Sequence, residues 1–421
     1  MTFVTRGSPS HASKFLRDVC AQIESPRLSR MHQEAKVLRT EAAGRGSGSF
    51  PMRMTWMRTG YQGIGLSSLS ELFLDVMDEK ILRKWVERHF VTGNAAIWVA
   101  GELPDDLVVM LPTGPRPEPP PVRWVEGLDT PTLVVDDVPG VGASFYAERS
   151  VAVAAGFRAL NRQLTRRIRV DRGLGYEVGY DRQPVSRDHA LSAVWVTCLP
   201  DAMRDVQQTV RESIDDVANR GPSDDELSRD FQEFPRDFGD PAAIPARLDA
   251  HVRDVLLGED PAPRTVASQI EERWRLESGH VAAAFKDVRD SMLFVLPKAG
   301  GVNPQRPFKP YPPPPTDKVG ADQVFEYAVK QKRGLFKKTP PAPRLAVGRG
   351  GVAIDSSRGK RISVVRWVDC VAIVRNKDVR SLVATDGTLL SIYRREWRDG
   401  GTALGLIDRF GPKELVVRAD K

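Results

Sequence analysis

The sequence contains few of the side chains that bind transition metals. Its 421 residues include six histidines and three cysteines. No two histidines lie three to five residues apart, so none form the pair with which a single helix holds zinc. The cysteines are widely spaced and odd in number, which argues against a disulfide framework and against a Cys-x-x-Cys site. We therefore expect three free thiols, at Cys20, Cys198 and Cys370.

Long apolar runs are also missing. No segment approaches eighteen consecutive apolar residues, so we expect no transmembrane helix. The first sixteen residues lack the apolar centre of a signal peptide, which predicts a cytoplasmic protein. The net charge is +7, but arginines alternate with acidic residues and no long basic tract occurs. This pattern does not favour a nucleic-acid partner.

Two proline-rich stretches divide the chain. They cover residues 113–127 and 299–344. Proline is excluded from helix interiors and central strands, and runs of it act as semi-rigid spacers. Such runs can also be polyproline ligands, although we favour linkers because the flanking segments differ in pattern. The chain then has three parts, at residues 1–112, 128–298 and 345–421.

The first part is expected to be mainly helical. Helices are predicted over residues 15–23, 28–43 and 75–90. Between the second and third, the segment RGSGSFP breaks the pattern because glycine and proline disfavour helix interiors. The segment NAAIWVAGELP, at residues 94–104, has the composition of a strand.

The middle part has the clearest pattern. A helix is predicted from about Ser150 to Arg172, because apolar residues spaced three and four apart form one face. Glycines then end this helix. The segment YEVGYDR alternates as a strand does, with Tyr176, Val178 and Tyr180 on one side. The segment ALSAVWVTC is its expected partner strand.

Helices return after this predicted hairpin. Apolar residues from Met203 to Val217 mark one helix, and Ser223 with Glu226 forms a capping box for the next. The segment MLFVLP is a final strand. This order predicts an α+β fold, with helices packed on a mainly antiparallel sheet.

The third part consists of short predicted strands. They lie at residues 344–355, 361–374, 381–386 and 387–393, and a helix is expected at 402–410. Asp386–Gly387 is a strong signal for a hairpin turn. A small β-rich domain is predicted here.

Several segments between residues 12 and 298 resemble the insulinase/pitrilysin family of zinc peptidases, which includes mitochondrial processing peptidase. They are QEAKVLRTEAA, LRKWVERHFVTGNAAIWVAGELP, RRIRVDRGLGYEVGYD, CLPDAMRDVQQTV and RGPSDDEL, in the family's order. The resemblance implies two half-repeats of helices on a sheet, the first of them incomplete.

The resemblance also implies where a zinc site should lie. In the family, an H-x-x-E-H helix supplies two histidines and the glutamate that activates water, and a distant glutamate completes the site. Glu41 matches the distant glutamate, and Glu34 matches an associated acidic residue. The H-x-x-E-H helix is absent, so the resemblance implies no zinc and no catalysis by this chain alone. Both glutamates are otherwise explained as a solvated helix face.

Two further residues match family positions that bind substrate. In the family, an arginine and a tyrosine from the second half donate hydrogen bonds to the scissile carbonyl and its oxyanion. Arg169 and Tyr176 keep that spacing. The alternative is that Arg169 is one of several solvated arginines and Tyr176 an ordinary sheet residue.

The third part resembles a small PH-like domain. Such domains bind lipids, peptides or neighbouring domains, and the fold does not decide which. An anionic surface, including a membrane, could contact Lys360, Arg361, Arg366 and Arg375. A solvated strand face is the favoured explanation of these charges, and a membrane ligand is therefore not favoured.

Three functions stay open at this point. The chain could be the Arg/Tyr-supplying subunit of a two-chain zinc peptidase, as in some bacterial members of the family, with zinc only in the partner. It could be a scaffold that binds a peptide or protein at a sheet edge, alone or as a homodimer. It could also be a fragment whose zinc helix lies upstream of Met1.

Overall fold

The chain folds into two units that are each built from three separate stretches. The computed structural model describes residues 1–45, 49–69, 74, 77–101, 105, 107–118, 121–258, 266–298, 308–312, 319–328, 342–355 and 361–418. Unit 1 combines Met1–Glu34, Asp78–Pro120 and Thr130–Lys309. Unit 2 combines Ala35–Met77, Pro121–Asp129 and Pro310–Lys421. The division differs from the predicted linear one, because residues 35–77 cluster with the C-terminal strands.

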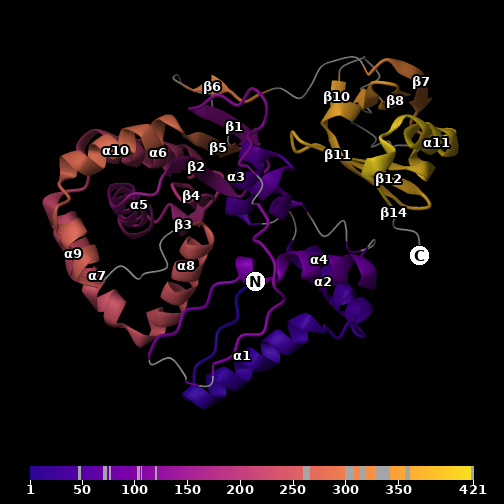
Figure 1. The fold of residues 1–421 in the computed structure, drawn as a ribbon. Helices are drawn as coiled ribbons and strands as arrows, with labels where there is room; N and C mark the ends of the chain where they lie inside the picture. Colours follow the sequence, from indigo (N-terminus) through magenta and orange to yellow (C-terminus); the bar gives the residue numbers. More distant parts are fainter. Residues whose placement is uncertain are drawn as a thin grey trace. The chain divides into compact units, whose positions relative to one another are not determined.

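A six-stranded sheet organises unit 1 (Figure 1). The strand order is β3-β4-β2-β5-β1-β6, so β3 is an edge strand. The strands β2, β3 and β4 form an antiparallel ladder, and β1 runs parallel to β5. The strands are β1 (Thr132–Asp136), β2 (Gly140–Glu148), β3 (Gly175–Pro184), β4 (His189–Cys198), β5 (Leu293–Pro297) and β6 (Lys309–Pro310).

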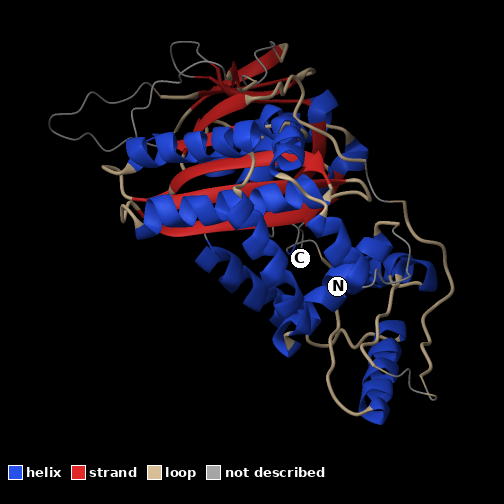
Figure 2. Cartoon of the chain, turned by 90° about the vertical axis from the view of Figure 1, so that its left-hand side faces the viewer, coloured by secondary structure: helices blue, strands red, loops and turns tan. Residues whose placement is uncertain are grey.

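Helices cover one face of this sheet, as Figure 2 shows. The three that pack on it are α5 (Val151–Leu164), α6 (Met203–Arg220) and α10 (Ser278–Asp290). Phe157 of α5 lies at the centre, with its ring 5.4 Å from that of Phe145 and 5.0 Å from that of Phe285. All three rings are fully buried, and each contributes about 2 kcal/mol through removal from water.

The remaining helices of unit 1 lie before α5 in the sequence or between α6 and α10. Before α5 come α1 (Pro9–Glu24), α2 (Met31–Arg45) and α4 (Glu79–His89), with α2 crossing into unit 2 after Glu34. After α6 come α7 (Asp224–Gly239), α8 (Ile244–Leu256) and α9 (Val266–Trp274). The predicted capping box is confirmed at the start of α7. Glu226 Oε2 accepts from Ser223 N at 2.9 Å, and Ser223 Oγ accepts from Glu226 N at 3.2 Å.

Two expectations for unit 1 are wrong. Residues 95–99 are irregular rather than a strand, and residues 102–104 lie outside the described ranges. None of the described residues that precede Thr132 forms a strand. This apolar segment therefore has no neighbouring strand in the first part of the chain with which to pair. The helix predicted to reach Arg172 ends as α5 at Leu164 and continues as a π-helical segment, Thr165–Val170.

In the described part of the chain, unit 2 contains two four-stranded sheets, helices α3 and α11, and the part of α2 that follows Glu34. One sheet has the order β10-β9-β8-β7, and the other β13-β12-β11-β14. A shared core joins the sheets to α11, and a helix that the sequence did not predict, α3, belongs to the same unit. The elements are α3 (Phe50–Thr59), β7 (Ala321–Glu326), β8 (Arg344–Gly348), β9 (Gly351–Asp355), β10 (Arg361–Arg366), β11 (Cys370–Arg375), β12 (Val379–Ala384), β13 (Leu389–Tyr393), α11 (Gly400–Phe410) and β14 (Val416–Arg418).

The Asp386–Gly387 hairpin is confirmed between β12 and β13. Gly387 has a φ of 91°, which a side chain would strain, and its N–H donates to the carbonyl of Ala384. The second proline-rich stretch is partly structured, since β6 and β7 lie within it. Residues 313–318 and 329–341 of that stretch lie outside the described ranges. No helix in the described part of the chain is long and apolar enough to span a bilayer.

Candidate functional site

The predicted substrate-binding arginine lies in the π-helical segment that follows α5. The segment Thr165–Val170 has the wider π-helical hydrogen-bond pattern, as in the bond from Asp171 N to the carbonyl of Arg166 at 2.8 Å. Single π turns within α-helices are found frequently at functional sites. Arg169 is exposed, and within the described ranges it has no hydrogen-bond or ion-pair partner.

A tight connection then leads from Arg169 to Tyr176. Leu174 N donates to the carbonyl of Ile168 at 2.8 Å, so the residues between them form a closed loop. Gly173 has a φ of 59°, which favours glycine. A Cβ on Gly175 would lie 3.0 Å from Ile168 Cγ2, so this position must also stay small. The loop therefore holds the π segment against the start of β3.

Tyr176 is the extra residue of a β-bulge. Gly175 pairs with Cys198 and Glu177 with Thr197, which leaves Tyr176 without a partner in the ladder. Its side chain is 90% exposed, whereas Val178 and Tyr180 pack against the core of unit 1. The prediction that these three residues share one side is therefore wrong at Tyr176. Bulges re-aim side chains and occur often beside active sites.

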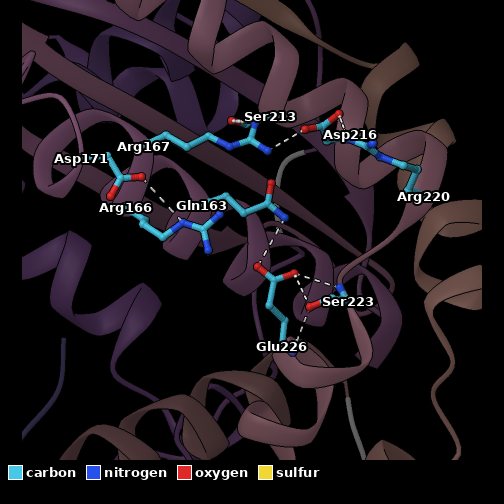
Figure 3. A network of polar contacts seen from close by, with 9 residues as sticks. All are labelled: Gln163, Arg166, Arg167, Asp171, Ser213, Asp216, Arg220, Ser223 and Glu226. Atoms are coloured by element: carbon cyan, nitrogen blue, oxygen red, sulfur yellow. Dashed lines mark hydrogen bonds and ion pairs between the residues drawn. The ribbon is translucent and has the colours of Figure 1, made fainter.

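Arg167 is anchored to a neighbouring helix, which distinguishes it from Arg169 (Figure 3). Arg167 donates to Ser213 Oγ at 3.1 Å and to Asp216 Oδ2 at 2.7 Å, both on α6. Arg166 lies 3.9 Å from Asp171 in a loose, exposed pair. The network in Figure 3 comprises Gln163, Arg166, Arg167, Asp171, Ser213, Asp216, Arg220, Ser223 and Glu226. The contacts of Arg167 fasten the π segment to α6, whereas Arg169 is exposed.

Exposed apolar side chains flank the Arg169–Tyr176 loop. Val170 and Leu199 are each 71% exposed, at the end of the π segment and just after β4. Cys198, opposite Gly175, is half-buried, and burial raises the pKa of its thiol. The loop thus presents a guanidinium, a phenol and two aliphatic groups on an open surface.

The two glutamates of α2 do not form a metal site. Glu34 lies 3.0 Å from Arg30 in an exposed ion pair, and Glu41 is exposed on the same helix. Nowhere among the described residues do three His, Cys, Asp or Glu side chains gather closely enough to hold a metal ion. A zinc ion with two oxygen donors and no histidine lacks the nitrogen ligands it prefers. The residues present therefore do not fit zinc.

Unit 1 also contains an ionic cluster that was not predicted from the sequence. Arg149 Nη2 lies 2.5 Å from Asp254 Oδ1, tying the start of α5 to α8. Arg182 of β3 lies nearby, and burial lowers the pKa of its guanidinium. Burial likewise raises the pKa of the Tyr180 hydroxyl. No sequence signal marks this cluster, because its members come from separate elements and sit among many similar charges.

In unit 2, the predicted basic surface is largely neutralised. Arg366 donates to Asp369, and Arg375 lies 3.5 Å from Asp408. Lys360 lies outside the described residues, as does the side chain of Arg361. The favoured explanation of a solvated strand face therefore suits Arg366 and Arg375 better than an anion-binding surface.

The same unit has an open groove of about 1000 Å³ beside the start of α11. Its walls include two arginines and two aspartates, so its charge is mixed rather than basic. These residues are Asp378, Arg394, Arg395 and Asp399.

Comparison with known proteins gives matches only among solved structures. No protein-family model and no curated protein matches the sequence. A protease from Helicobacter pylori superposes with a TM-score of 0.52 at 12% identity, covering 69% of this chain and 77% of that one. A peptidase M16 inactive domain from Pseudomonas fluorescens superposes with a TM-score of 0.49 at 14% identity, covering 67% and 73%. A chain of Complex III2 from Candida albicans superposes with a TM-score of 0.49 at 10% identity, covering 68% and 75%.

The likeness to the Helicobacter pylori protease shows a shared fold. The predicted α+β class, with helices on a mainly antiparallel sheet, is thereby confirmed.

Proposed function

We propose that this chain is an insulinase-type homologue without its own zinc site, which supplies Arg169 and Tyr176 to a zinc-bearing partner chain. The observation that carries the proposal is the presentation of both side chains to solvent from adjacent irregularities, a π turn and a β-bulge. Zinc and the water-activating glutamate would come from the partner. This chain alone would bind no zinc and would act in the cytoplasm.

The proposed chemistry uses only hydrogen-bond donation from this chain. A guanidinium and a phenol are strong donors that need not lose a proton to stabilise the oxygen of a scissile carbonyl. Arg167 and the Ile168–Leu174 bond hold the loop in place, so little rearrangement is needed when substrate arrives.

The test begins with native mass spectrometry of the chain isolated from its own source, with metal retained. We expect a complex with a second, zinc-bearing chain. In that complex, Arg169→Ala should lower the peptidase rate about 100-fold or more, as loss of an oxyanion donor does. Arg166→Ala is the matched control, because Arg166 is exposed in the same π segment. An unchanged rate in Arg169→Ala would remove the basis of the proposal.

An alternative function is a peptide- or protein-binding scaffold. It is favoured by the position of β3 at the edge of the six-stranded sheet, where an extended peptide could add a strand. The chain would then be a metal-free monomer or homodimer in native mass spectrometry. Arg169→Ala would leave its peptide affinity unchanged, which separates this function from the first.

A third alternative is that a zinc helix precedes Met1 in a longer chain. Translation of the DNA upstream in the same frame would decide it, since an H-x-x-E-H segment there would restore the missing ligands.

A further inference from the structure

Helix α3 ends against the hairpin turn that joins β12 and β13 of unit 2. Trp56 Nε1 donates to the carbonyl of Gly387 at 3.2 Å. A Cβ on Gly387 would lie 2.5 Å from Trp56 Nε1, so the indole fills the space that the glycine leaves. The hairpin turn is therefore shaped to accept this side chain.

The residue that ends α3, Gly60, also packs closely against the backbone of this turn. Gly60 has a φ of 59°, and a Cβ there would lie 1.9 Å from the carbonyl oxygen of Thr385. Any other residue would clash with backbone that cannot move aside cheaply. A glycine on each side thus brings the helix end and the turn into direct contact.

The C-terminal half of α3 is largely buried. Met54 and Met57 are fully buried, and Arg58 is only 2% exposed. Burial lowers the pKa of the Arg58 guanidinium to about 9. A helix of ten residues is too short to be stable in water without such packing.

Two other segments of unit 2 bind the backbone of α3. Tyr311 Oη donates to the carbonyl of Met57 at 2.7 Å, and Val125 N donates to the carbonyl of Arg58 at 2.8 Å. These bonds satisfy carbonyls in the last turn of the helix, which have no partner within it.

We propose that the C-terminal β domain is a receptor for helix α3 of its own chain. The docked helix is then the ligand of the surface around the β12–β13 turn, and it closes that surface to a lipid or an outside peptide. The C-terminal β domain and α3 thereby form one folded unit, in which the helix occupies the surface around the β12–β13 turn.

Hydrogen exchange on the full chain tests this coupling from both sides. Gly60→Ala should speed exchange at least 10-fold in α3 and also in β12 and β13, because the two stabilise each other. Trp56→Ala should do the same, because it removes the indole that donates to the Gly387 carbonyl and leaves the turn itself unchanged. Gly405→Ala is the matched control, since a Cβ at this exposed position of α11 meets nothing within 4 Å. It should leave both regions protected.

The outcomes separate docking from general damage. Faster exchange confined to α3 would overturn the proposal, because the β domain would then be independent of the helix. So would equal protection in all variants. Exchange of β4 in unit 1 is followed in the same experiment. The protection of β4 should persist. If β4 lost protection together with α3, β12 and β13, the effect would be general unfolding and the proposal would be refuted.

Discussion

Replacement of Asp230 should weaken the packing of α7 on α5, the helix that leads into the Arg169 segment. The Asp230 carboxylate accepts from Arg158 Nε at 2.6 Å and from Nη2 at 2.7 Å, and its side chain is only 6% exposed. Arg162 adds a longer contact at 3.5 Å. Asp230→Asn removes the charge and places an amide group opposite a guanidinium donor.

The expected cost follows from the two charge-assisted bonds. Each contributes about 1.5–3 kcal/mol net, but water can partly replace the carboxylate at Arg158, whose side chain is 34% exposed. We therefore expect a loss of about 2 kcal/mol. Since 1.4 kcal/mol corresponds to a factor of ten, amide exchange in α5 and α7 should become about 30-fold faster.

A second pair provides the control. Asp171→Asn makes the same chemical change in an exposed ion pair with Arg166 at 3.9 Å, where we expect about 0.5 kcal/mol or less. In a double-mutant cycle, Arg158→Gln should make Asp230→Asn less costly by about 1 kcal/mol or more. If Asp230→Asn and Asp171→Asn had equally small effects, the buried pair would not hold these helices together.

Three further predictions concern stability and reactivity. Phe157→Ala should lower the free energy of unfolding of unit 1 by about 3–5 kcal/mol in urea titrations, and a loss under 1 kcal/mol would contradict its central position. Ser150→Ala removes the cap that accepts from Val153 N at 3.2 Å, and should cost about 1 kcal/mol, read as faster exchange in the first turn of α5. Burial raises the pKa of the Cys370 thiol from 9.0 to about 11, so iodoacetamide at pH 8 should alkylate it about 100-fold more slowly than an unfolded peptide of the same sequence. Because the unfolded thiol loses its proton first, the stability of unit 2 should fall as the pH rises from 9 to 11.

Local and periodic features of the fold were predictable from the sequence. The apolar stripe from Met203 to Val217 specifies α6, because each helical turn repeats the same buried face. The Ser223–Glu226 capping box and the Asp386–Gly387 turn depend on neighbouring residues only, and both are confirmed.

Features that depend on distant contacts were not predictable. Helix α3 could not be predicted from its composition, because Pro51 and the preceding glycines suggest a break. Its stability comes from burial in unit 2. The π segment interrupts the helical pattern that α5 begins, and the bulge at Tyr176 interrupts the alternation of β3. No unusual residue in the sequence marks either interruption. Spacing therefore placed Arg169 in a helix and Tyr176 in a strand, as the structure does, but it gave no sign of the π turn or of the bulge.

The exposure of Arg169 and Tyr176 bears on which function they can perform. A hydrogen bond made in water contributes only about 1 kcal/mol net, because the donor exchanges one partner for another. Oxyanion donors are effective when water is excluded and the local dielectric is low. With Tyr176 90% exposed, this loop alone does not provide such an environment. Under the proposed function, the pair would therefore need a second surface that covers it, and the exposed Val170 and Leu199 beside it suit contact with such a surface. This requirement favours the two-chain peptidase over independent action, and it predicts that Arg169 becomes protected from solvent only in the complex.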